Sequence, residues 1–218
     1  RQPEFTQLDL EMSFIEPKEV YNLVEGLLSS LFETLLDIKI STPFERMPYQ
    51  TAMQDYGVDA PDLRFDLKLK DISDIAGQCG LKVFSDAIER GGIAKAINIK
   101  RGSDFSRKEL DELTEFVKIY GAKGMAWVKR NEEGWQSPIA KFFSMEDQCA
   151  IEKRLDVEVG DLILFGADNI NIVNNALGNL RKEVARRRKL IPENTYKFVW
   201  ITDFPLMEYS ASDKRYHA

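Results

Sequence analysis

An alternation of polar and apolar residues near the start of the chain restricts its fold more than any other pattern, and it runs from Gln7 to Phe14. A period of two is typical of a strand with one buried face, so we predict a strand over residues 7–14. Its apolar face carries Leu8, Leu10, Met12 and Phe14. Its other face carries Gln7, Asp9, Glu11 and Ser13, and acidic residues are uncommon on strands. Such a face suits an ammonium group, a metal ion or a nucleotide; the alternative is a half-exposed strand that happens to be acidic.

Composition limits the class of protein. At 218 residues the chain holds one or two domains, and its 44% hydrophobic and 30% charged residues are typical of a soluble globular protein. We expect no membrane contact, because no apolar run approaches the ~20 residues of a span. With a net charge of -6, any RNA contact must come from local basic clusters. Cys79 and Cys149 lack the neighbours of a zinc site, so we predict no metal site here and a reducing, cytoplasmic location.

The first part of the chain after the strand predicts helices and a turn. Apolar residues recur at helical spacing over residues 17–37, with Pro17 suited to the first turn, so we expect an amphipathic core helix. A shorter helix is expected over residues 48–56, ending at Gly57. Residues 59–64 then form a turn that leads into an extended segment.

The middle of the chain has the pattern of an α+β module. Strands are expected over residues 81–84, 93–100, 125–129, 135–143, 162–165 and, buried on both faces, 198–201. Helices are expected from the capping box at Ser106, from Ser144, and over residues 169–190. The last helix ends in a basic cluster of Arg181, Lys182, Arg186, Arg187, Arg188 and Lys189. This cluster either complements the helix dipole as a solvated end or contacts phosphates.

Four segments carry a family resemblance. They are RQPEFTQLDLEMSF at residues 1–14, YGVDAPDLRF at 56–65, FVKIYGAKG at 116–124 and DFPLME at 203–208. In this order they resemble bacterial-type aspartyl-tRNA synthetases of class II, from motif 2 onward. The resemblance implies an α+β fold in which a class II antiparallel-sheet catalytic core (residues 1–65 and 193–218) is interrupted by an α+β insertion domain of the GAD type (residues 66–192). Because the chain starts with Arg inside a motif, we expect it to be a fragment, with little activity alone.

The family resemblance also implies an activity. Such enzymes activate L-aspartate with ATP, using Mg²⁺, and transfer the aspartyl group to the 3′ end of tRNA(Asp). Whether tRNA(Asn) is also a substrate is left open by the sequence. A cytoplasmic homodimer is expected from the family.

The resemblance assigns roles to individual residues. Gln2 is expected to contact ATP. Gln7 is expected to face the ammonium group of the amino acid, Asp9 to hold a lysine that reads the substrate side chain, and Glu11 to belong to the same network. Asp59, Asp62 and Arg64 are assigned to the region of the tRNA acceptor end, although Asp62 and Arg64 could simply cap a turn. The family usually has lysine where this chain has Ala60.

A second class of function stays open at this point. Related insertion domains occur in a tRNA-dependent amidotransferase subunit, so the chain could be a non-catalytic module that binds tRNA or protein. The opening segment with Gln2, Gln7 and Asp9 favours the enzyme, because a binding module alone would not need it.

Overall fold

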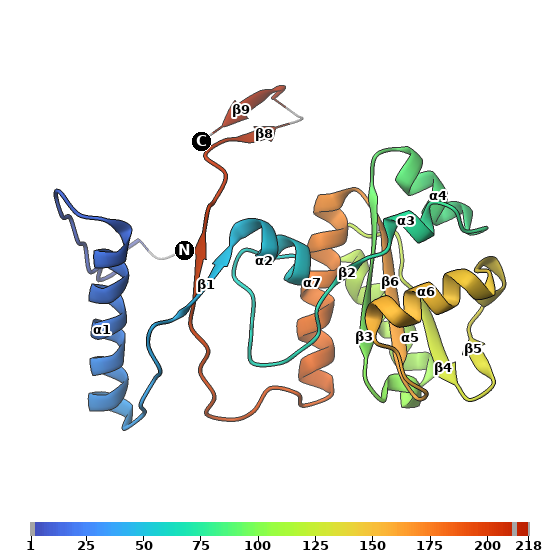
Figure 1. Cartoon of the computed structure of the whole chain (residues 1–218), viewed down its shortest axis with the longest axis horizontal. Coiled ribbons are helices and arrows are strands. Elements are labelled where there is room, and N and C mark those ends of the chain that lie inside the picture. The colour runs from blue at the N-terminus through green and yellow to red at the C-terminus, as the bar shows by residue number, and fades with distance from the viewer. Residues whose placement is uncertain (1–2, 211–212, 218) are drawn as a thin grey trace. The chain divides into compact units, whose positions relative to one another are not determined.

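The computed structural model describes residues 3–210 and 213–217 (Figure 1). The chain divides into two compact units: the described residues of Arg1–Glu45 with Phe198–Trp200 form the first, and those of Arg46–Lys197 with Ile201–Ala218 form the second. The helices are α1 (Pro17–Leu36), α2 (Tyr49–Tyr56), α3 (Ser73–Ala76), α4 (Lys82–Glu89), η1 (Gly102–Asp104), α5 (Arg107–Lys118), η2 (Ala140–Phe142), α6 (Met145–Leu155) and α7 (Ile170–Arg187). The strands are β1 (Glu45–Pro48), β2 (Lys70–Asp71), β3 (Ile93–Ile99), β4 (Ala126–Asn131), β5 (Gly134–Gln136), β6 (Leu162–Asp168), β7 (Val199–Thr202), β8 (Glu208–Ser210) and β9 (Arg215–His217).

An antiparallel sheet forms the centre of the second unit. Its five strands lie in the order β2-β3-β6-β4-β5. The longest pairing joins β3 to β6, from Ile93 opposite Asp168 to Ile99 opposite Leu162. Because β3 runs toward the start of β6 and α7 returns from the end of β6, β3 and α7 finish at the same edge of the sheet (Figure 1).

Side chains alternate across this sheet and build a core on each face. On β6, Leu162 and Leu164 pack with α5 and α7, whereas Ile163 and Phe165 pack with α3, α4 and α6. All four side chains are fully buried. A continuous apolar strand is expected where both faces of a sheet are covered, which is the arrangement seen here.

Local signals set the helix ends in this unit. Ser106 caps α5, with its hydroxyl accepting from the Glu109 backbone N–H at 3.2 Å and its own N–H donating to the Glu109 carboxylate at 2.8 Å. Ser144 caps α6 in the same reciprocal way with Asp147. α2 ends at Gly57, whose φ of 72° is the left-handed conformation that glycine adopts at helix ends. These ends confirm the predicted boundaries to within a few residues.

Four predicted strands need correction. The expected strand over residues 7–14 is wrong, because residues 3–16 form no strand, and the side chain of Leu8 is 68% exposed. A strand needs neighbours for its N–H and C=O groups, which alternation alone does not supply. The expected strand at 81–84 is the first turn of α4, with Phe84 and Ala87 buried at helical spacing. The strand predicted over residues 135–143 ends already at Gln136, as β5. The strand predicted over residues 198–201 corresponds to β7, whose residues are half-buried rather than buried on both faces.

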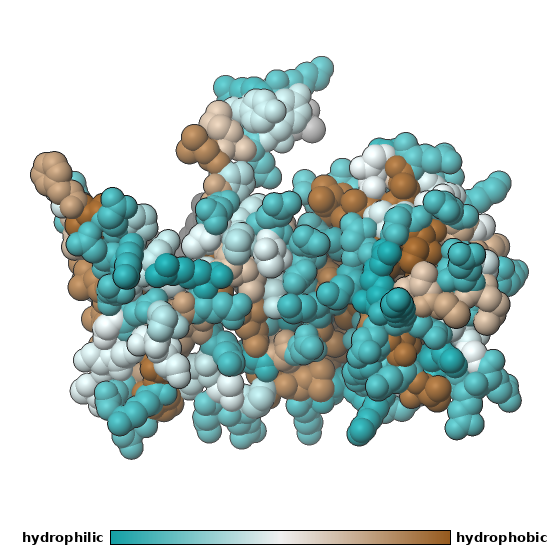
Figure 2. Space-filling view, viewed as in Figure 1, coloured by the Kyte–Doolittle hydropathy of each residue, from teal (hydrophilic) through white to brown (hydrophobic). Residues whose placement is uncertain are grey.

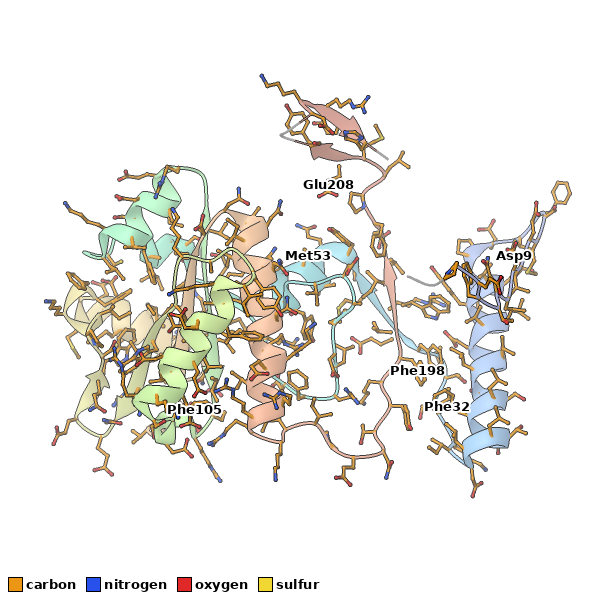
Figure 3. The ribbon with its side chains drawn as sticks, turned by 180° about the vertical axis from the view of Figure 1, so that it is seen from behind. Asp9, Phe32, Met53, Phe105, Phe198 and Glu208 are labelled. Atoms are coloured by element: carbon orange, nitrogen blue, oxygen red, sulfur yellow. The ribbon has the colours of Figure 1, made fainter. Side chains whose placement is uncertain are left out.

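The first unit consists mainly of α1, which begins with Pro17 at its first position as predicted. Its apolar stripe is not the core face that we expected, since Leu31 and Leu35 are 43% and 72% exposed. Brown side chains are visible along this helix (Figure 2). The part that is covered packs on residues 198–200: the ring of Phe198 lies 5.3 Å from that of Phe32 (Figure 3). Glu25, only 4% exposed, accepts a hydrogen bond from Trp200 Nε1 at 2.9 Å.

In the part of the chain that the structure describes, none of the helices has the length and apolar character needed to span a bilayer.

Candidate functional site

The predicted amino-acid site lies in the opening segment of the first unit. Gln7, Asp9 and Glu11 are all exposed there, and Asp9 is marked in Figure 3. Among the described residues, these three side chains make no hydrogen bond or ion pair. Gln2, the predicted ATP contact, lies outside the described residues.

The predicted acceptor-end residues lie in the loop between α2 and β2. Arg64 donates from Nε and a terminal nitrogen to the two carboxylate oxygens of Asp62, at 2.9 and 2.7 Å. This charge-assisted contact with the Arg64 side chain holds the pKa of Asp62 below its usual value, against the raising effect of burial. The backbone N–H of Arg64 also donates to Asp62, so the pair closes a turn. Asp59 is exposed and takes no part in this pair.

A buried arginine holds this loop against α7. Arg181 is fully buried, which corrects its assignment to a solvated basic end. Its guanidinium donates to the carbonyl oxygens of Leu67 at 3.0 Å and Asp62 at 3.1 Å, and it lies over the Phe65 ring at 4.3 Å. Carbonyl dipoles and ring faces thereby replace the water that a cation loses on burial. Burial lowers the pKa of Arg181, with nearby Tyr56 and acidic groups acting in the opposite direction.

A buried lysine makes a second link from β3, and sequence reasoning missed it. Lys95 is 3% exposed. Its ammonium donates to the carbonyl oxygens of Met53 at 3.2 Å and Gln54 at 2.9 Å, near the end of α2, and to Asn174 Oδ1 at 2.7 Å; Met53 is labelled in Figure 3. Desolvation by burial lowers its pKa to about 8. The sequence does contain a signal for it, because Lys95 shares its strand face with Ile93 and Ile97.

A hollow of about 970 Å³ lies at the sheet edge where β3 and α7 end. Its wall also includes the end of α6 and the segment around β2. Five of its cationic side chains are ion-paired to carboxylates; they are Lys68, Lys100, Arg154, Arg187 and Arg188. Three more, Lys70, Arg101 and Lys189, have no ion pair with any described residue. Asp66 and Asp156 are the acidic side chains in the wall. Cationic side chains therefore outnumber acidic ones among the described residues of the wall, and carboxylates pair with five of them.

A buried carboxylate supports one wall of the hollow. Asp161 is 1% exposed and accepts from the backbone N–H groups of Arg101 at 2.8 Å and Glu158 at 2.9 Å, and from Asn98 Nδ2 at 3.0 Å. Burial alone would raise its pKa, but these hydrogen bonds and the charge of Lys100 outweigh burial and lower it. Asp161 thus fixes the backbone from which Lys100 and Arg101 project.

Comparison with known proteins places this sheet in a family. A family model described as the GAD domain matches residues 84–177, from the first turn of α4 to the middle of α7. The chain contains a GAD domain. The domain takes in four of the five sheet strands, all but β2, and part of the hollow's wall.

Beyond the GAD domain, the similarity covers the whole chain. It is 53% identical over 218 residues, its full length, to "Aspartate--tRNA(Asp/Asn) ligase" of Desulfosudis oleivorans, of which it covers 36%. It is 53% identical over 216 residues to the protein of the same name from Persephonella marina, covering 99% of this chain and 36% of that protein. "Aspartate--tRNA ligase" of Macrococcus caseolyticus is 49% identical over 219 residues, covering 100% of this chain and 37% of that protein.

These similarities confirm the resemblance to bacterial-type aspartyl-tRNA synthetases. The helices and antiparallel sheet confirm the α+β class with a GAD-type insertion. The chain spans only about a third of the length of these relatives, 36% of the first. The predicted domain limits at residues 65 and 192 stay predictions.

Proposed function

We propose that the chain is part of an aspartate–tRNA ligase, an ATP-dependent enzyme of protein synthesis. The observation that carries this proposal is the whole-length identity of 53% to a relative of that name. The GAD domain and the unpaired polar side chains of the opening segment agree with it.

The proposed reaction has two steps. An oxygen of the aspartate α-carboxylate attacks the α-phosphorus of ATP, and pyrophosphate leaves. A ribose hydroxyl at the 3′ end of the tRNA then attacks the acyl carbon, and AMP leaves. The first nucleophile is already an anion, so the step needs positioning and charge neutralisation rather than a strong base.

The residues expected to act on the substrates lie in the opening segment. We assign Gln2 to ATP, Gln7 to the ammonium group, Asp9 to orienting a basic side chain that reads the substrate carboxylate, and Glu11 to the same network. Exposure and the lack of competing partners support the last three. Asp59, Asp62 and Arg64 are assigned to the acceptor end, where a tRNA contact would have to share the Asp62–Arg64 pair.

The remaining features of the proposal concern partners and the ion. In the described part of the chain, no cluster of three or more His, Cys, Asp or Glu side chains is suited to a metal ion. We assign Mg²⁺ to the phosphates of the incoming ATP. tRNA(Asp) is the proposed acceptor, with tRNA(Asn) as a second one because relatives carry both in their names. A cytoplasmic homodimer completes the proposal, and the two free thiols agree with a reducing compartment.

Exchange of pyrophosphate into ATP by the full-length protein tests the first step. We expect exchange with aspartate and none with asparagine or lysine. A protein that binds tRNA but shows no exchange with any of these would contradict the proposal and favour a binding module.

Asp9→Ala tests the amino-acid site. Loss of the carboxylate frees the basic side chain that it orients, so the KM for aspartate should rise more than the KM for ATP. Glu4→Ala is the matched control, since Glu4 is an exposed acid of the same segment with no assigned role. Equal rises for both substrates would refute the role of Asp9.

A further inference from the structure

We propose that the cationic hollow at the end of β3 and α7 binds the phosphodiester backbone of RNA. The proposal rests on the proposed function, because tRNA is the RNA that such an enzyme would hold. It adds a contact surface within the second unit, separate from the residues assigned to aspartate and ATP.

Charge is the first argument for this surface. The chain carries a net charge of -6, yet among the described residues eight cationic and two acidic side chains line the hollow, and carboxylates pair with five of the eight cations. They come from four separate segments, which the antiparallel topology brings to one sheet edge. Cations that face the hollow without a carboxylate partner can supply the local attraction that a polyanion needs on an acidic protein, since no global field attracts it.

The ion pairs divide these cations into two groups. The carboxylates that pair with Lys68, Arg154 and Arg188 are Asp55, Asp74 and Asp104, none of which lines the hollow. These acids hold their partners from outside the wall.

The unpaired group is the second argument. Lys70, Arg101 and Lys189 have no acidic partner among the described residues, although each lines the hollow. Lys189 follows α7 and complements its dipole, but Lys70 and Arg101 do not follow a helix. Helix dipoles therefore do not account for this group, whereas phosphate contacts do.

The wall also decides between an RNA backbone and a nucleotide. Among the described residues that line it, there is no aromatic side chain on which a base could stack and no glycine that would let a polyphosphate approach the backbone. Charge without base-reading groups fits sequence-independent contact with phosphates.

The test removes the three unpaired cations from the full-length protein. The variant K70Q/R101Q/K189Q leaves the ion pairs of the described residues intact. Glutamine has backbone preferences similar to those of the lysine and arginine that it replaces. K82Q/K108Q/K123Q is the matched control, with the same change of charge at exposed lysines that make no ion pair with a described residue. Binding of a fluorescent tRNA transcript is measured by anisotropy from 50 to 200 mM salt, with thermal unfolding as the check on folding.

We expect the hollow variant to flatten the slope of log affinity against log salt by about two to three, which is about one for each phosphate that the protein no longer neutralises. The control variant should keep the wild-type slope. Equal slopes in both variants would overturn the proposal, as would release of the RNA by micromolar inorganic tripolyphosphate, which would assign the hollow to a small anion. Aspartate-dependent pyrophosphate exchange needs no RNA, so it reports separately on the proposed function.

Discussion

Burial of Lys95 should make the free energy of unfolding of the second unit vary with pH in the alkaline range. Its pKa falls from 10.5 to about 8 because burial disfavours the ammonium. A difference of this size corresponds to about 3 kcal/mol. Between pH 8 and 10.5 the unfolded chain still binds this proton and the folded chain does not, so the free energy of unfolding rises with pH over this window.

The assay is urea unfolding of wild type and Lys95→Met from pH 7 to 10.5. Because other groups titrate in both proteins, the informative quantity is the difference between their free energies of unfolding. We expect wild type to gain about 2 to 3 kcal/mol relative to Lys95→Met between pH 8 and 10.5. Below pH 7 the difference should be constant, since lysine is then charged in both states.

Lys82→Met is the control, because Lys82 is exposed and its removal should leave the pH profile unchanged. If the wild-type and Lys95→Met profiles run parallel, or if wild type loses relative stability as the pH rises, the ammonium is not desolvated as the structure shows. Parallel profiles would mean that the three oxygen acceptors of Lys95 offset the cost of burying its ammonium.

Three further substitutions test the contacts of the loop between α2 and β2 and those of the hollow. Arg181→Met should lower the free energy of unfolding by about 3 kcal/mol, because carbonyl groups that it satisfied become unpaired; a change below about 1 kcal/mol in urea unfolding would contradict this. Asp161→Asn should cost about 2 to 4 kcal/mol at pH 7, and much less below the lowered pKa of Asp161, so thermal unfolding against pH should show the two proteins converging in acid. Gly57→Ala should be severely destabilising, because its φ is 72° and the new Cβ would lie 2.3 Å from the Asn174 carbonyl oxygen; an unchanged Tm would show that the loop can shift.

Local signals in the sequence predicted those parts of the fold that local interactions determine. In α5 and α7, apolar residues recur at helical spacing over several turns. Ser106 caps the start of α5 and Gly57 caps the end of α2 through contacts with residues close to them in sequence. The opening segment has an equally clear pattern but no strand, because strand formation depends on partners far along the chain. The start of α4 resembles a strand in sequence, since a window of four residues cannot separate a period of two from one of 3.6.

The candidate sites divide in the same way. Asp62 and Arg64 are two residues apart, so their pairing could be predicted as a turn cap. Arg181 and Lys95 could not be placed, because their acceptors lie 114 and 42 residues away along the chain. A basic residue among apolar residues at the spacing of a buried face indicates that its side chain is buried. The carbonyl groups that accept its hydrogen bonds cannot be predicted in this way, because they depend on tertiary packing.

The anchoring of residues 53–67 by Lys95 and Arg181 limits where the GAD-bearing unit can be excised. A piece starting at residue 66 would keep both cations but lack the carbonyl oxygens of Met53, Gln54 and Asp62 that they bind. Two charged groups would then face a partly emptied interior, and the piece would be expected to swell or aggregate. A piece starting at residue 46 retains these acceptors. A version of this module that is transferred into another protein should therefore include α2 and the loop between α2 and β2 together with the sheet.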